Sequence, residues 1–134
     1  MLTRKTRQVK TLQRVLREHE SPLSVNQIWE HARQTEPDIG IATVYRHIAR
    51  WIQDGWLVLV EIPGQPARYE IAGKSHHHHF VCEACGVVFE LPGCVAGLDS
   101  LLPAGFQARR HELAVFGACG LCSLNKENDN AITH

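Results

Sequence analysis

The sequence has no long apolar run: no stretch approaches the roughly 18 consecutive apolar residues that indicate a membrane-spanning helix. The first seven residues, MLTRKTR, also lack the apolar segment of a secretory signal peptide. We therefore expect a cytoplasmic protein with no membrane partner. In that reducing compartment, paired cysteines bind metal more often than they form disulfides.

The chain also has no net charge, with 14 basic and 14 acidic residues, which by itself would disfavour a nucleic-acid partner. The charge is unevenly distributed, however. Residues 1–75 contain 11 Lys and Arg against 8 Asp and Glu, whereas residues 76–134 contain 3 against 6. Basic residues are densest before residue 20, and a basic stripe of this kind is either a phosphate-contacting surface or a solvated helix face.

Signatures of catalysis are missing too. There is no HExxH motif, no sizeable substrate domain, and no βαβ pattern around a Cys-x-x-Cys pair that would indicate a thioredoxin-like enzyme. Glu70 with His77 and His79 could be imagined as a catalytic zinc site with an open water position. A metal-storage or chaperone protein is a further alternative, but both leave the first half of the chain without a role. We expect neither catalytic residues nor a small organic substrate.

What is present in the first half is a pattern of three helices followed by a hairpin. Apolar residues recur at helical spacing in residues 9–16, in residues 25–34 behind a Ser24 N-cap, and in residues 42–53 before Gly55. Strand patterns at 57–62 and 67–71 flank a turn-rich connector at 63–66. This order is typical of a winged helix-turn-helix, whose third helix reads DNA.

The third predicted helix has one apolar and one polar face. Its apolar face includes Trp51, and we expect Trp29, Trp51 and Trp56 to belong to the core rather than to stack on bases. The outward residues are Thr43, Arg46, His47 and Arg50, with Tyr45 at the border.

A small metal-rich α/β module is predicted for residues 76–124, after a hinge at 73–75. It contains strands at 77–82 and 87–91, a short helix at 95–102 and a strand at 107–116. The fold class is therefore α+β, with a winged-helix domain at 1–72 and a flexible tail at 125–134.

Two Cys-x-x-Cys pairs give the strongest single signal. Cys82, Cys85, Cys119 and Cys122 can close a tetrahedral site, and each pair has an adjacent glycine suited to a tight turn. Buried free cysteines are the alternative, but two such pairs seldom arise by chance in so short a chain. We predict a structural zinc.

The four-histidine run at 76–79 supplies more ligands than that zinc can use. If the run is extended, His77 and His79 face one side and His76 and His78 the other, so one run can serve two sites. Carboxylates at Glu70 and Glu90 can complete the first set. Cys94 and His111 are available for the second.

These motifs together resemble those of the ferric uptake regulator (Fur) family of bacterial metal-responsive repressors. The similarity runs over residues 6–122 and is most specific at 40–46 (GIATVYR), 67–71 (ARYEI), 76–86 (HHHHFVCEACG) and 119–122 (CGLC).

The resemblance implies a homodimer in which residues 76–124 form the dimerisation domain. Metal at the hinge would lock the winged helices over double-stranded, palindromic operator DNA. By position, Glu70, His77, His79 and Glu90 match the hinge-side regulatory site, and His76, His78 and His111 match a second regulatory site within the dimerisation domain. Tyr45, Arg46 and Arg7 match DNA-contacting positions, to which we add Thr43 and Arg50.

The sequence departs from the family pattern at two positions. Pro22 stands where the hinge site of the family often takes a histidine from the winged-helix domain. Either His19 or Glu20 replaces that histidine here, or the hinge site has one ligand fewer. Near Cys94 many relatives carry an acidic ligand. A thiolate there favours zinc over hard, oxygen-preferring ions. We therefore expect a zinc-responsive regulator; iron response is the main alternative, followed by peroxide sensing through histidine oxidation, manganese and nickel.

Overall fold

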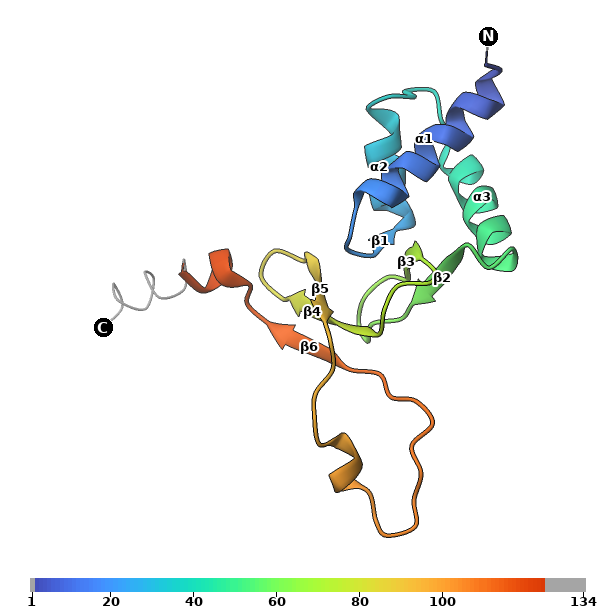
Figure 1. Cartoon of the computed structure of the whole chain (residues 1–134). Helices are drawn as coiled ribbons and strands as arrows, with labels where there is room; N and C mark the ends of the chain where they lie inside the picture. Colours follow the sequence, from blue (N-terminus) through green and yellow to red (C-terminus); the bar gives the residue numbers. More distant parts are fainter. Residues whose placement is uncertain (1, 125–134) are drawn as a thin grey trace. The chain divides into compact units, whose positions relative to one another are not determined.

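The computed structural model describes residues 2–124 and divides into two compact units, Met1–Lys74 and Ser75–His134 (Figure 1). The boundary between the units falls inside the segment 73–75 that the sequence assigns to a hinge. The predicted flexible tail at 125–134 lies outside the described residues. Among the described helices, none has the length and apolar character needed to cross a membrane.

The first unit contains the three helices and the hairpin that the sequence predicts. The helices are α1 (Arg4–Glu18), α2 (Val25–Arg33) and α3 (Ile41–Gln53), and the hairpin strands are β2 (Leu57–Val60) and β3 (Arg68–Ile71). A further strand, β1 (Leu23–Ser24), pairs antiparallel with β3 and gives a sheet of order β1-β3-β2. This two-residue strand is too short to produce a periodic signal in the sequence.

Local side chains fix the start of α2. Ser24 Oγ accepts a hydrogen bond from the Gln27 backbone N–H at 3.3 Å, and Gln27 Oε1 accepts one from the Ser24 N–H at 2.9 Å. This reciprocal capping box satisfies backbone donors that a helix N-terminus otherwise leaves unpaired. It confirms Ser24 as the N-cap.

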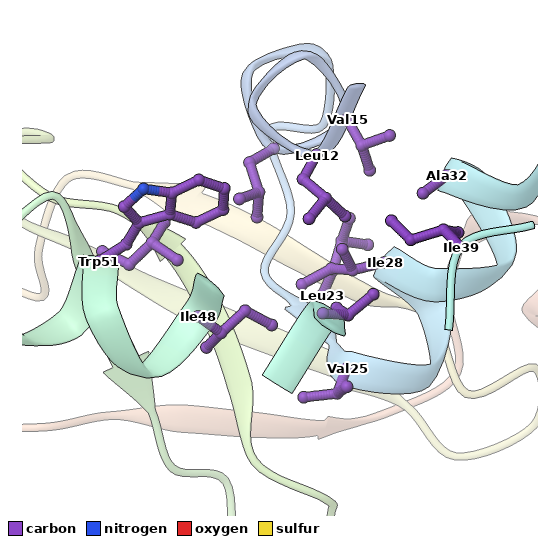
Figure 2. Packing of buried hydrophobic residues seen from close by; sticks show 12 residues of the cluster. Leu12, Val15, Leu23, Val25, Ile28, Ala32, Ile39, Ile48 and Trp51 are labelled. Atoms are coloured by element: carbon purple, nitrogen blue, oxygen red, sulfur yellow. The ribbon is translucent and has the colours of Figure 1, made fainter. Parts of the chain in front are cut away.

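The core of the first unit lies between the three helices and the sheet. Leu12, Ile28 and Val44 are each 0% exposed, and Trp51 belongs to the same buried cluster, which Figure 2 shows from close by. The partly buried Trp29 and Trp56 pack against this cluster, which confirms the core role predicted for the tryptophans. Close packing of buried apolar side chains of this kind stabilises the fold of the unit.

The second unit is built on a three-stranded sheet of order β5-β4-β6. Strand β4 (His77–Cys82) pairs antiparallel with β5 (Val88–Pro92) and parallel with β6 (Ala114–Gly117). The parallel pairing sets Cys82 opposite Gly117, and therefore brings the chain after β6 towards the turn that follows β4.

Two sequence predictions for this unit are wrong in extent. The helix predicted at 95–102 is a four-residue 3₁₀ helix, Leu98–Leu101, which follows Gly97 in a left-handed conformation at φ 87°. The strand predicted at 107–116 begins only at Ala114, because β4 offers a parallel partner from His79 onward. Residues 107–113 have no such partner among the described residues, and a strand is stabilised by pairing with its neighbour.

Candidate metal centres

The four cysteines of the two Cys-x-x-Cys pairs converge in the second unit. Their sulfur atoms all lie within 4.8 Å of one another. The first pair follows β4, where Gly86, at φ 77°, closes a tight turn by donating its N–H to the Cys82 carbonyl at 2.9 Å. The second pair follows β6 directly.

Backbone N–H groups stabilise a thiolate, the form of cysteine that binds metal, in this cluster. Cys82 Sγ is fully buried and accepts hydrogen bonds from the N–H groups of Cys119 at 3.3 Å and Cys85 at 3.4 Å. These bonds, above all the one from the Cys119 N–H, lower the pKa of the Cys82 thiol to about 6. The pKa of the Cys122 thiol is raised to about 12, chiefly by the side chain of Cys119. Four sulfur donors with one stabilised thiolate are a donor set that fits a structural zinc.

A second cluster joins three histidines and the fifth cysteine. The members are His76, His78, Cys94 and His111, and their ligand atoms also lie within 4.8 Å of one another. The Nε2 atom of His76 is 3.1 Å from that of His78 and 3.0 Å from that of His111. Cys94 Sγ lies 2.9 Å from His111 Nε2 and 3.5 Å from His78 Nε2.

His78 is the buried member of this second cluster, with 5% of its surface exposed. Its burial, and then the neighbouring imidazoles of His76 and His111, lower the pKa of His78. A neutral imidazole is the form that binds metal. Three ring nitrogens and one sulfur facing a common point, without a carboxylate, fit a closed tetrahedral site for zinc.

The predicted hinge set divides between the two units. His77, His79 and Glu90 belong to the second unit, where the rings of His77 and His79 are 4.9 Å apart and His77 Nδ1 is 3.6 Å from Glu90 Oε1. The separation of His77 and His79 from the other two histidines is the one that strand parity predicts. Glu70 lies on β3 of the first unit, and its joining with these ligands stays a prediction.

Pro22, which stands where family members often have a metal-binding histidine, and the nearby His19 make contacts that the sequence did not indicate. Pro22 is fully buried, and its carbonyl accepts a hydrogen bond from Arg68 Nη1 at 3.3 Å. His19, which the sequence offers together with Glu20 as an alternative to a site with one ligand fewer, has its Nδ1 2.7 Å from the Val15 carbonyl and its ring 4.3 Å from that of His31.

The predicted DNA-contacting side chains of α3 are accessible. Tyr45 is 54% exposed, and Arg46 and Arg50 also lie on the outer side of the helix, with Thr43 half-buried. Arg46 Nη2 donates to Thr43 Oγ1 at 3.0 Å.

Ion pairs hold two of the predicted DNA-contacting arginines. Arg50 is paired with Asp54 at 3.2 Å, and Arg7 of α1 is paired with Glu36 at 3.6 Å. Both guanidinium groups keep exposed surface, so their predicted role as DNA contacts stays a prediction.

Comparison with known proteins identifies relatives of this chain by sequence and by fold. The model of the ferric uptake regulator family matches residues 2–116. The chain is 29% identical over 126 residues to the ferric uptake regulation protein of Campylobacter jejuni, covering 90% of this chain and 80% of that protein. Its fold is similar to that of the Helicobacter pylori ferric uptake regulator, with a TM-score of 0.68 and 24% identity over 91% of this chain and 83% of the other.

A third similar structure is a zinc-bound manganese uptake regulator. The TM-score is 0.73, with 22% identity over 89% of this chain and 90% of the other. At this level of identity the structural likenesses show the fold, and the match to the family model over most of the chain shows the membership. The chain belongs to the ferric uptake regulator family of metal-responsive transcriptional regulators.

Proposed function

We propose that this protein is a zinc-responsive repressor that binds operator DNA as a homodimer in the cytoplasm. The observation that carries the choice of zinc is the sulfur of Cys94 among the imidazoles of His76, His78 and His111. Thiolate and imidazole ligands together suit zinc, whereas carboxylate oxygens suit harder ions such as manganese(II). The four-cysteine cluster would hold a separate structural zinc in the same unit.

An iron-responsive regulator is the second candidate. The curated relative from Campylobacter jejuni, like others of similar identity, is named as a ferric uptake regulation protein. The hinge set, with two imidazoles and the carboxylates of Glu70 and Glu90, contains no sulfur and is compatible with either ion. The hinge set alone therefore does not distinguish the two candidates, and the choice of zinc rests on the second cluster.

Regulation follows from thermodynamic linkage. Bound metal supplies a positive charge that holds carboxylates and neutral imidazoles together. Glu70 precedes the hinge and His77, His79 and Glu90 follow it, so a set that unites them restricts the orientation of the reader unit. If the metal-bound arrangement is also the one that fits the operator, metal and DNA raise one another's affinity by the same factor, about 5- to 150-fold for typical couplings.

The predicted DNA-contacting residues of α3, together with Arg7 of α1, form what we call the reader surface, and its composition is the one expected for a DNA contact. Tyr45 and Arg46 at the start of α3 would meet base edges in the major groove, while Thr43, Arg50 and Arg7 would contact the phosphate backbone. This surface favours a DNA regulator over a zinc enzyme or a metal-storage protein, neither of which needs it.

A gel-shift experiment on promoter DNA tests the proposal. Binding is measured after chelator treatment and after addition of zinc, iron(II) or manganese(II) at matched free concentrations. We expect zinc to restore binding at the lowest free concentration. Binding that is insensitive to chelator would exclude a metal-responsive regulator, and restoration by iron at lower concentration would favour the second candidate.

A further inference from the structure

Lys74, the last residue of the first unit, places its ammonium group beside the buried carboxylate of Glu70. Its Nζ is 3.7 Å from Glu70 Oε2 and donates a hydrogen bond to the Glu20 carbonyl at 2.6 Å. The Glu70 side chain is 6% exposed and that of Lys74 27% exposed. The ammonium group is therefore fixed from two sides.

The strand geometry explains why Glu70 needs a counter-charge. On β3, Tyr69 and Ile71 pack against the apolar core, so the alternating Arg68 and Glu70 lie on the opposite face of the sheet. A carboxylate removed from water is costly unless an opposite charge or hydrogen-bond donors compensate. Lys74 supplies part of that compensation within the first unit.

We propose that Lys74 competes with the regulatory metal for Glu70 and thereby sets the metal concentration at which the regulator responds. This inference rests on the proposed role of Glu70 as a hinge ligand. A divalent cation at Glu70 would repel the nearby ammonium, so the Lys74–Glu70 ion pair is lost or weakened when metal binds. By linkage, the free energy of the pair is subtracted from the free energy of metal binding.

The expected size of the effect follows from the exposure of the pair. Exposed ion pairs contribute about 0.2 to 1 kcal/mol, and the burial of Glu70 places this pair at the upper end, which corresponds to about five-fold in affinity. A threshold shift of this size changes the working range of a regulator without removing any of its ligands.

The test is the zinc affinity of the hinge set, measured by competition with a chromophoric chelator. All variants carry His111→Ala and Cys94→Ala, which remove two ligands of the second cluster and leave the hinge set as the exchangeable site. In this background we expect the Lys74→Met protein to bind zinc about five-fold more tightly than the protein that keeps Lys74. Lys74→Arg, which keeps the charge, should remain close to the unsubstituted lysine.

Glu70 variants separate this inference from the proposed function. Glu70→Gln should weaken zinc binding, and adding Lys74→Met to Glu70→Gln should produce no further change, because the carboxylate that the lysine contacts is gone. If Glu70→Gln leaves the affinity unchanged, the hinge assignment of Glu70 is wrong. If Glu70→Gln weakens binding but Lys74→Met does not tighten it, the hinge assignment stands and the competition by Lys74 is refuted.

A second readout observes the lysine directly. In the metal-free protein the Lys74 ammonium group, held by the Glu20 carbonyl, should give a slowly exchanging side-chain ¹⁵N signal. Zinc titration should shift or broaden this signal in step with the affinity measurement. A signal that stays constant through saturation of the hinge set would contradict the displacement of Lys74.

Discussion

The sulfur of Cys94 lies 2.9 Å from Nε2 of His111, although 16 residues separate the two in the chain. Cys94 follows β5 and His111 precedes β6, so this contact closes the base of a long connection whose only regular element is the short 3₁₀ helix Leu98–Leu101. A metal held by both residues would cross-link that connection. Cross-links of this kind stabilise a fold chiefly by restricting the unfolded chain.

Metal selectivity should depend on Cys94. We expect Cys94→Asp to lower the zinc affinity of the second cluster and to raise its affinity for manganese(II) relative to zinc, because an oxygen donor replaces a soft sulfur donor. Isothermal titration with each ion measures both changes. Cys94→Ser is the control for side-chain size, and equal zinc affinities in all three proteins would show that Cys94 is not a ligand.

Zinc should also protect the connection from proteolysis. Arg109 and Arg110 lie in it and are exposed, which makes them trypsin sites. We expect zinc to slow cleavage after these residues at least several-fold in the wild-type protein, since a metal-bridged loop opens less often. In Cys94→Ala the protection should be reduced, whereas cleavage after Lys5 provides an internal reference. Protection that is undiminished in Cys94→Ala would assign it to another site.

The structural and regulatory metal sets should separate by mutation. We expect Cys82→Ser to abolish stable folding of the second unit and dimerisation, because Cys82 Sγ is the buried thiolate on which two backbone N–H groups converge. His77→Ala should leave a folded dimer whose DNA binding no longer responds to metal. Sedimentation and metal analysis distinguish the two, and a dimeric, zinc-loaded Cys82→Ser protein would refute the structural assignment.

The helical half of the fold could be predicted from the sequence because its signals are local. Helical periodicity fixes the faces of α1, α2 and α3, and the Ser24–Gln27 capping box fixes the start of α2 within three residues. Strand β1 could not be predicted in this way. Its two residues are a strand because β3 runs beside them, and that neighbour is remote in the sequence.

The candidate sites show the same division between local and remote information. Strand parity separates His77 and His79 from His76 and His78, since the alternation is a property of an extended backbone alone. The meeting of Cys94 with His111 depends on the path of the connection between β5 and β6, which has no periodic pattern. The contact of Lys74 with Glu70 and Glu20 likewise depends on tertiary structure.

The stability of the first unit should fall at mildly acidic pH. Burial, and then repulsion from Arg46 and Lys5, lowers the pKa of His47 below its ordinary 6.5, and burial with repulsion from His19 lowers the pKa of His31. The unfolded chain therefore binds protons more readily than the folded unit. Stability that is present above the unfolded pKa is lost as the pH falls through the folded pKa.

Urea unfolding followed by tryptophan fluorescence measures this effect, because all three tryptophans lie in the first unit. We expect the unfolding midpoint to decrease from pH of about 7 to about 5, and His47→Gln to reduce the decrease. Metal binding to the second unit also depends on pH, so both proteins are compared at the same saturating zinc concentration. An identical pH profile for His47→Gln would show that His47 does not contribute.

The last prediction separates base reading from phosphate contact on the reader surface. Arg46 is proposed to meet base edges, so Arg46→Ala should cost about 1 to 3 kcal/mol of operator affinity and relax the preference for operator over unrelated DNA. Arg7, on α1, is predicted to contact the backbone. Arg7→Ala should weaken operator and unrelated DNA alike and reduce the slope of log affinity against log salt by about one.

Arg33→Ala is the matched control for both substitutions. Arg33 is an exposed arginine of α2 that is paired with Glu30 at 3.4 Å, much as Arg7 is paired with Glu36, but it is not among the predicted DNA contacts. Fluorescence anisotropy over a salt series, with operator and scrambled duplexes at saturating zinc, gives affinity, specificity and slope together. If Arg33→Ala weakened binding as much as Arg7→Ala, the loss would reflect general charge rather than a defined contact, because each variant removes one positive charge from the same unit.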